Sequence, residues 1–302
     1  MRYRDVLIHT HAFLARDVRD PPPIQTRIDL SDQIWIGPLD DQIAKSVIDA
    51  CDSRYFGPIP HPRDAWQLYS CVCELNVTHK NWNWDHDHVL EAVVARSRLL
   101  HPTSADLLCA ARISFDENGR VDEIYPAVWS GISLEVFLSP QRGRNWLVEA
   151  DAGVLCELVT RLPMPLPERV HTAFWHHEYA ARTYYINYRW SFICAGLEAL
   201  LHTDRRRNTA QFVQRLPALA SELGITITET QADEAYDVRS RLVHGLSLLS
   251  TGPGGPPAPQ TQLYDCIEDI LRLGVLRCMR NSTFTDIFRS DDLIRSRWPL
   301  HP

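Results

Sequence analysis

The sequence has no apolar run of about 18 residues, so it contains no candidate for a membrane-spanning helix. The N-terminal stretch MRYRDVLIHTHAFLARD interrupts its apolar residues with His and Arg, and we expect no signal peptide there. Apolar residues make up 45% and charged residues 23% of the 302 residues, which is typical of soluble globular proteins. This length suits two modest domains better than one.

The sequence also has no C-x-x-C pair. Because a zinc ribbon or a disulfide framework needs closely spaced cysteines, neither is expected. We interpret the thiols as reduced and mostly buried, as in cytoplasmic proteins. The eight cysteines are scattered, at positions 51, 71, 73, 109, 156, 194, 266 and 278.

Three common nucleotide and esterase motifs are missing. The chain has no G-x(4)-G-K, no G-x-G-x-x-G and no G-x-S-x-G. Nucleotide hydrolysis, dinucleotide redox chemistry and serine esterase chemistry therefore have no support, and no cofactor is expected.

Lysine is scarce: Lys45 and Lys80 are the two lysines among 31 basic residues. The net charge of −7 argues against a protein that coats nucleic acid without specificity. The charge is uneven, however. Residues 168–302 hold 15 arginines and 15 acidic residues, so the negative excess lies in the first half.

The first half mixes two kinds of pattern. Short apolar runs, partly alternating, predict strands, whereas longer amphipathic runs predict helices. We therefore expect a small α+β domain over residues 1–162. The predicted strands lie in 5–14, 24–37, 66–75 and 105–116, and the predicted helices in 40–51 and 87–100.

The sequence PMPLP at 163–167 predicts a stiff, extended domain boundary, because proline cannot continue a helix. From residue 168 to residue 302 the pattern is almost wholly helical, which predicts a four-helix bundle. The stripe Ile186, Trp190, Ile193, Leu197 and Leu200/Leu201 has helical spacing. We expect main helices over 169–202, 208–223 with a proline interruption, 228–244 and 260–281, then a loop at 251–259 and a short tail over 284–298.

The third of these helices has signals at both ends. Thr228 with Gln231 three residues later predicts a capping box. Gly245 stands where a left-handed residue ends a helix. The last turns read YDVRSRLVHG, with Arg239 and His244 five residues apart. Five residues place these side chains about 140° apart on a helix, so they could flank a cleft but not share a face.

Arginine and histidine together fit the cleavage of RNA by its own 2′-hydroxyl. That reaction needs a proton acceptor, a proton donor and a cation for the phosphate. Histidine exchanges protons near neutral pH, and arginine grips phosphate through a fork of donors. One subunit offers one such histidine, whereas a symmetric dimer would bring two copies of His244 and of Arg239 into one cleft.

YDVRSRLVHG, with ICAGLEALL (193–201) and NTAQFVQRLPAL (208–219) before it, resembles the Apea-like branch of the HEPN superfamily. The resemblance covers about 169–298. It implies a dimeric four-helix bundle and a metal-independent endoribonuclease that leaves 2′,3′-cyclic phosphates, with Arg239 and His244 as the catalytic pair. Ser240 matches a position that is often Asn, Asp or His in the family, and Glu198 matches an acidic residue that can orient the arginine. The family settings are toxins, phage defence and RNA processing.

Two other interpretations of the pair stay open. Arg239 could simply pair with Glu234 or Glu198, while His244 caps the carbonyl end of its helix. Some HEPN-like domains have lost catalysis, so the second half could be a scaffold that dimerises and binds. If the second half is a nuclease, we expect residues 1–162 to sense a signal, bind a partner or restrain it. If the second half is a scaffold, we expect them to bind a protein or a small ligand.

Two histidine-rich stretches resemble metal sites at first sight. In WNWDHDHVLE (82–91), His86 and His88 are too far apart on a helix to share an ion, and an aspartate at 85 or 87 fits a helix N-cap better. FWHHEYAARTYY (174–185) lacks the H-E-x-x-H order of zinc proteases. We interpret its His176, His177 and Glu178 as a polar stretch of a long helix, with an RNA contact as the alternative.

The densest basic run is Arg205, Arg206 and Arg207. It is interpreted either as a solvated turn or as a patch that follows an RNA backbone. Six aromatic residues of the first half could stack on bases, although aromatics in strands belong to the core more often. These are Trp35, Trp66, Tyr69, Trp82, Trp84 and Trp129.

Overall fold

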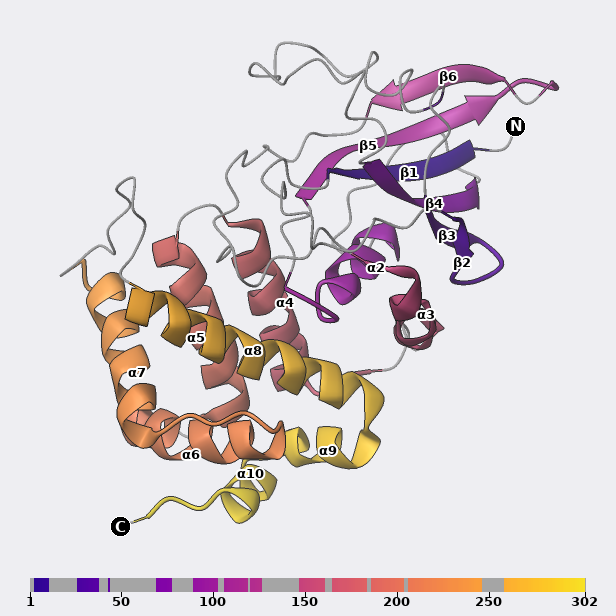
Figure 1. Cartoon of the computed structure of the whole chain (residues 1–302). Coiled ribbons are helices and arrows are strands. Elements are labelled where there is room, and N and C mark those ends of the chain that lie inside the picture. Colours follow the sequence, from indigo (N-terminus) through magenta and orange to yellow (C-terminus); the bar gives the residue numbers. More distant parts are fainter. Residues whose placement is uncertain are drawn as a thin grey trace. The chain divides into compact units, whose positions relative to one another are not determined.

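The computed structural model describes residues 3–10, 26–37, 43, 69–77, 89–102, 106–118, 120–126, 147–160, 165–183, 186–203, 206–245 and 258–301. Its chain contacts divide the protein into two compact units, residues 1–162 and 163–302. The division lies at the start of the PMPLP stretch. We describe each unit by itself (Figure 1).

The first unit contains an antiparallel six-stranded sheet with the order β2-β3-β4-β1-β5-β6. All four stretches in which strands were predicted contain them. β6 was not predicted, because Asp122 and Glu123 interrupt its apolar pattern; such charges are common on an edge strand. The strands are β1 Tyr3–Thr10, β2 Ile28–Asp29, β3 Ile34–Gly37, β4 Tyr69–Val77, β5 Asp106–Phe115 and β6 Val121–Pro126.

Two helices, α2 (Val89–Ser97) and α3 (Ala152–Thr160), share a core with β3. Ile36, Val93 and Leu155 are among its buried side chains. The buried Arg96 joins the two helices, because its Nη1 donates to the carbonyl oxygen of Leu158 at 2.9 Å. The helix predicted at 87–100 corresponds to α2, while the helix predicted at 40–51 lies outside the described residues apart from residue 43.

The second unit is helical throughout its described residues. Its long helices are α4 Glu168–Arg182, α5 Ile186–Leu201, α6 Asn208–Glu222, α7 Glu229–Val243 and α8 Ala258–Arg280. The short helix α9 (Ser282–Asp286), the 3-10 turn η5 (Ile287–Arg289) and α10 (Asp291–Arg297) follow. The helices α6, α7 and α8 therefore lie where they were predicted, and α6 continues through Pro217.

The prediction of one helix over 169–202 is wrong: α4 and α5 form an antiparallel pair. Nη1 of Arg169, at the start of α4, donates to the carbonyl oxygen of Ala199, near the end of α5, at 3.0 Å. Thr183 adopts an extended conformation after α4. Threonine and tyrosine, which make up the TYY sequence at this point, favour helices weakly. Five long helices therefore replace the four that were expected over the same residues.

A buried arginine of α5 binds the last carbonyl groups of α4. Arg189 in α5 is 2% exposed. Its Nε donates to the carbonyl oxygen of Thr183 at 2.7 Å, and its Nη2 donates to that of Ala181 at 3.3 Å. The last carbonyls of a helix lack partners within the helix, so Arg189 caps α4 from the next helix.

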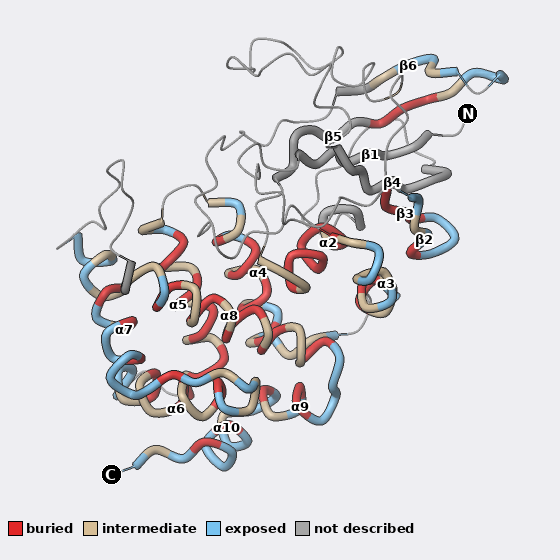
Figure 2. The backbone as a smooth tube through the Cα atoms, viewed as in Figure 1, coloured by how far each residue is buried: buried red, intermediate tan, exposed pale blue. Residues whose placement is uncertain are grey.

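The core of this unit lies among α4, α5, α6, α7 and α8. The predicted stripe of α5 is buried, except for Ile186, which is half-buried. Nε1 of the fully buried Trp190 donates to the carbonyl oxygen of Ala235 in α7 at 3.1 Å. Figure 2 shows that α7 is exposed along much of its length, whereas α5 alternates between buried and half-buried residues. One side of α7 is thus free to carry polar groups.

Candidate functional site

The helix that carries Arg239 is capped at both ends, as predicted. The backbone nitrogen of Gln231 donates to Oγ1 of Thr228 at 3.2 Å, and the backbone nitrogen of Thr228 donates to Oε1 of Gln231 at 3.0 Å. At the other end, Gly245 has a φ of 67°, in the left-handed region. Helix α7 therefore ends at Val243, and His244 is its C-cap residue.

His244 is exposed at this end of α7, while its backbone nitrogen donates to the carbonyl oxygen of Ser240 at 3.0 Å. Ser240 is half-buried. No hydrogen bond or ion pair joins the side chains of Arg239 and His244, both of which the structure describes. The two groups are held five residues apart on one rigid helix, on different sides of it.

Arg239 pairs with Glu198, one of the two acidic partners that the sequence suggested. Nη2 of Arg239 lies 3.0 Å from Oε2 of Glu198, and the two side chains are 25% and 16% exposed. The pair connects α7 to α5. The alternative partner, Glu234, is exposed on α7. The guanidinium carbon of Arg239 also lies 5.7 Å from the ring centroid of Tyr236, which is within the range of a cation–π contact.

The ion pair is partly desolvated. Burial raises the pKa of Glu198, and the charge of Arg239 and the hydrogen bonds from Arg239 and Tyr236 only partly offset this effect. Burial also raises the pKa of Tyr236, and the carboxylate of Glu198 raises it further. Since electrostatic interactions strengthen away from water, this environment favours an anion beside Arg239.

The guanidinium of Arg239 keeps donors for a ligand. Within the part of the chain that the structure describes, Glu198 is its one hydrogen-bond partner. A guanidinium has five N–H donors in a planar fork that matches the oxygens of a phosphate. Glu198 therefore holds one side of Arg239 and leaves the remaining donors available.

Sequence reasoning missed His202, which lies one turn after Glu198. The backbone nitrogen of His202 donates to the carbonyl oxygen of Glu198 at 2.9 Å. Burial lowers the pKa of His202 to about 4, and the positive charges of Arg239, Arg215 and Arg169 add to the effect. His202 directly follows α5, and its i,i+4 spacing from Glu198 places it on the same side of the last turn as Glu198. This spacing was available in the sequence.

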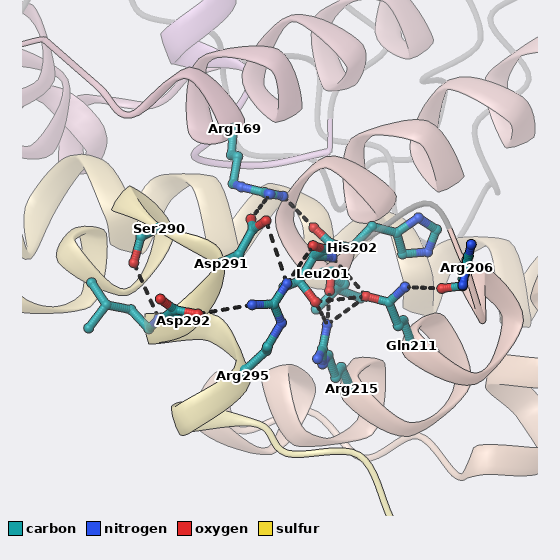
Figure 3. Close-up of polar contacts among 12 residues, drawn as sticks. Arg169, Leu201, His202, Arg206, Gln211, Arg215, Ser290, Asp291, Asp292 and Arg295 are labelled. Carbon is teal, nitrogen blue, oxygen red and sulfur yellow. Dashed lines mark hydrogen bonds and ion pairs between the residues drawn. The ribbon is translucent and has the colours of Figure 1, made fainter.

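Three arginines from three helices hold the end of α5 (Figure 3). Arg169 donates to the carbonyl oxygens of Ala199 and His202. Arg215, which is 2% exposed, donates to that of Leu201 at 2.6 Å. Arg295 of α10 donates to the carbonyl oxygen of Thr203 at 2.9 Å. These bonds satisfy the carbonyl groups that the end of a helix leaves unpaired.

The basic run of Arg205, Arg206 and Arg207 lies between α5 and α6. Arg206 and Arg207 are exposed, whereas Arg205 lies outside the described residues. Arg207 is the N-cap of α6 and has a φ of 57°, a conformation that side chains other than glycine rarely adopt. Tyr236 and Thr209, the second residue of α6, share a side-chain hydrogen bond. The start of α6 therefore adjoins the surroundings of Arg239.

The stretch containing His176, His177 and Glu178, predicted as a polar stretch of a long helix, lies in α4 and is largely buried. His177 is 2% exposed, and Glu178 is fully buried in α4. Oε1 of Glu178 lies 2.6 Å from Nε of Arg182. Because both side chains are buried inside the helical unit, the alternative of an RNA contact by His177 or Glu178 is wrong. The nearby His176 is half-buried.

Trp35 belongs to the core, as predicted: it is 6% exposed, and Arg27 lies over its ring. Residues 66, 82, 84, 85–88 and 129 lie outside the described residues, and the side chain of Tyr69 is not described. The cysteines whose side chains are described, Cys156, Cys194, Cys266 and Cys278, are free thiols.

Over the described ranges, no three His, Cys, Asp or Glu side chains are grouped so that they could hold a metal ion. A search of the same ranges finds no helix with the length and apolar character needed to cross a membrane. Compared with known proteins, the chain matches no family model, no curated protein and no solved structure.

Proposed function

We propose that the protein is a metal-independent RNA endonuclease of the HEPN type. The observation that carries the proposal is the pairing of Arg239 with Glu198 across α5 and α7. This contact orients a partly desolvated guanidinium and leaves most of its donors available to a phosphate. The resemblance of the second unit to Apea-like HEPN domains supports the same assignment.

In this mechanism the 2′-hydroxyl of RNA attacks the adjacent phosphorus. A bond forms between O2′ and phosphorus, and the bond from phosphorus to the 5′ oxygen breaks. Arg239 stabilises the extra negative charge on the phosphate oxygens. His244 serves as an acid/base that moves a proton to or from the reacting oxygens, and the product carries a 2′,3′-cyclic phosphate.

The reaction needs a second proton-transfer group, which a homodimer supplies through its second copy of His244. The exposure of His244 at the end of α7 suits a cleft formed between two copies. Arg206 and Arg207 would add general affinity for the RNA backbone, together with Arg205. The first unit would sense a signal, bind a partner or restrain the nuclease, and the protein would act as a toxin or phage-defence effector in the cytoplasm.

The test is to express wild type and His244→Ala in cells, map new 3′ ends in total RNA and assay them for 2′,3′-cyclic phosphate. We expect cleavage by wild type and its loss in His244→Ala and Arg239→Gln. Arg241→Gln is the matched control, because Arg241 is an exposed arginine of the same helix that pairs with Asp237. Purified protein should cleave equally well in EDTA. Unchanged cleavage by His244→Ala would exclude this mechanism.

The second candidate is a HEPN-like scaffold that dimerises and binds without catalysis. The same ion pair favours it, because Glu198 already neutralises Arg239 in the free protein. In that case His244 only ends α7. The scaffold predicts intact RNA with wild type and with His244→Ala, together with a dimer in solution that both proteins form equally.

A further inference from the structure

The backbone around His202 is held more firmly than a helix end requires. The carbonyl oxygen of His202 accepts from Arg169. The next backbone nitrogen, that of Thr203, donates to Oε1 of Gln211 at 2.7 Å, and the carbonyl oxygen of Thr203 accepts from Arg295. Figure 3 shows the ring of His202 pointing away from this network. The backbone from which the ring projects is therefore rigidly held. A side chain that positions another group needs such support.

One nitrogen of this ring lacks a partner. Nε2 of His202 is buried, and no described group forms a hydrogen bond with it. The ring has a hydrogen bond with the backbone of Asn208, which raises the pKa of His202 and only partly offsets the effect of burial. Because nearly all buried polar atoms in proteins form hydrogen bonds, a buried nitrogen without one calls for an explanation.

The surroundings keep this ring neutral. Arg239 of α7, Arg215 of α6 and Arg169 of α4 bring positive charge from three helices. Two carboxylates that contact these arginines are themselves paired, Glu198 with Arg239 and Asp291 of α10 with Arg169. Together with burial, these charges hold the pKa of His202 at about 4. A neutral imidazole carries one nitrogen that accepts a hydrogen bond, whereas the charged ring has only donors.

We propose that His202 is a positioning residue, whose Nε2 accepts a second N–H of Arg239 when that arginine binds a phosphate of RNA. Glu198 in α5 and His202, one turn later and just after the end of α5, would then hold two parts of the guanidinium, and the remaining donors would face the phosphate. The identity of the ligand as RNA rests on the proposed function. The pairing of His202 with Arg239 rests on three observations: Arg239 contacts Glu198, His202 follows Glu198 by one helical turn, and Nε2 of His202 is buried without a hydrogen bond.

The test is a double-mutant cycle between His202 and Arg239. The probe is a 2′-O-methyl oligoribonucleotide, which lacks the attacking hydroxyl and stays intact. Dissociation constants are measured for wild type, His202→Leu, Arg239→Gln and the double variant. His202→Gln keeps an acceptor at this position. The control is His171→Leu, which removes a histidine of α4 whose Nε2 accepts from Nε1 of Trp175 at 3.0 Å.

We expect His202→Leu to weaken binding about tenfold in the presence of Arg239 and not at all in Arg239→Gln. His202→Gln and His171→Leu should bind like wild type. The ¹⁵N signal of His202 Nε2 should shift when the oligonucleotide binds to wild type, and not when it is added to Arg239→Gln. A protein in which His202 only fills space would show neither the coupling nor the shift.

Additive effects of the two substitutions would overturn the role of His202, as would equal losses in His202→Leu and His202→Gln. So would a wild type that does not bind the probe. Failure of the proposed nuclease has a different signature: wild type binds the probe but leaves unmodified RNA intact. In that outcome the cycle still decides whether His202 positions Arg239.

Discussion

Glu198 in α5 and Arg239 in α7 are separated by 41 residues in the chain, yet Oε2 and Nη2 of their side chains lie 3.0 Å apart. Both side chains are mostly buried, so the pair is neither a surface ion pair nor a fully enclosed one. A surface pair contributes little to stability, and a buried pair is costly to desolvate. Partial burial suits Arg239, which must stay charged and still reach a ligand.

Glu198→Gln is expected to raise stability at neutral pH and to lower RNA cleavage. Burial raises the pKa of Glu198 above its ordinary value of 4.5. The folded state therefore binds more protons than the unfolded state above pH 4.5, and the stability contributed by this group falls as the pH rises through the raised pKa. Glutamine does not ionise, so the variant does not lose this stability as the pH rises. Its neutral oxygen holds Arg239 less firmly by about 1 kcal/mol, which predicts cleavage about fivefold slower.

Urea unfolding of wild type and Glu198→Gln at pH 7 and at pH 4 measures the first effect. The variant should be more stable at pH 7, and the difference should shrink at pH 4. Equal stabilities at pH 7 would contradict the assigned cost of burying this carboxylate.

His202 should make the fold sensitive to acid. Its pKa falls from 6.5 to about 4 in the folded protein. Between these values the unfolded state binds more protons, so stability is lost as the pH falls from 6.5 towards 4. At about 1.4 kcal/mol for each pKa unit, the loss amounts to roughly 3 kcal/mol at most. Unfolding free energies measured over this range should depend less on pH in His202→Gln than in wild type. His301→Gln, which alters an exposed histidine, should keep the wild-type dependence.

Gly196→Ala should destabilise the helical unit by about 1–3 kcal/mol, because the added methyl overpacks the core. A Cβ atom at Gly196 would lie 2.7 Å from Cδ2 of Leu271 and 3.2 Å from Cβ of His176. Gly274→Ala in α8 is the control: the nearest atoms would be at 3.8 Å. Since alanine favours helices, it should raise stability by about 0.5–1 kcal/mol. Chemical denaturation measures both, and equal effects would contradict the close contact at Gly196.

Arg207→Gly tests two properties of Arg207: the strain of its backbone conformation and its contribution to RNA binding. Because glycine adopts the left-handed conformation without penalty, removing the side chain at a φ of 57° should raise stability by about 1 kcal/mol. If Arg207 follows an RNA backbone, the same change should weaken RNA binding and lower its dependence on salt. Arg206→Gly, at an exposed neighbour without positive φ, should weaken binding without the gain in stability. RNA affinity unchanged in both variants would favour the solvated turn.

Local patterns in the sequence were sufficient for several elements. The cap at Thr228 and the left-handed Gly245 were predictable because each depends on residues within one helical turn. The buried stripe of α5 follows from its spacing in the same way. For the site, the sequence suggested Arg239, either Glu198 or Glu234 as its partner, and His244 at the end of the helix. All of these depend on neighbours within a helix or on the recognised motif.

The tertiary structure decided what depends on distant groups. The break after Arg182 is capped by Arg189 of the next helix, and the end of α5 is capped by Arg169, 30 residues away from Ala199. The role proposed for His202 depends on Arg239, which the packing of α7 brings to Glu198, one turn before His202. A sequence pattern records which faces of a helix are apolar, whereas only the packed helices determine which charges meet and which carbonyl groups still need a donor.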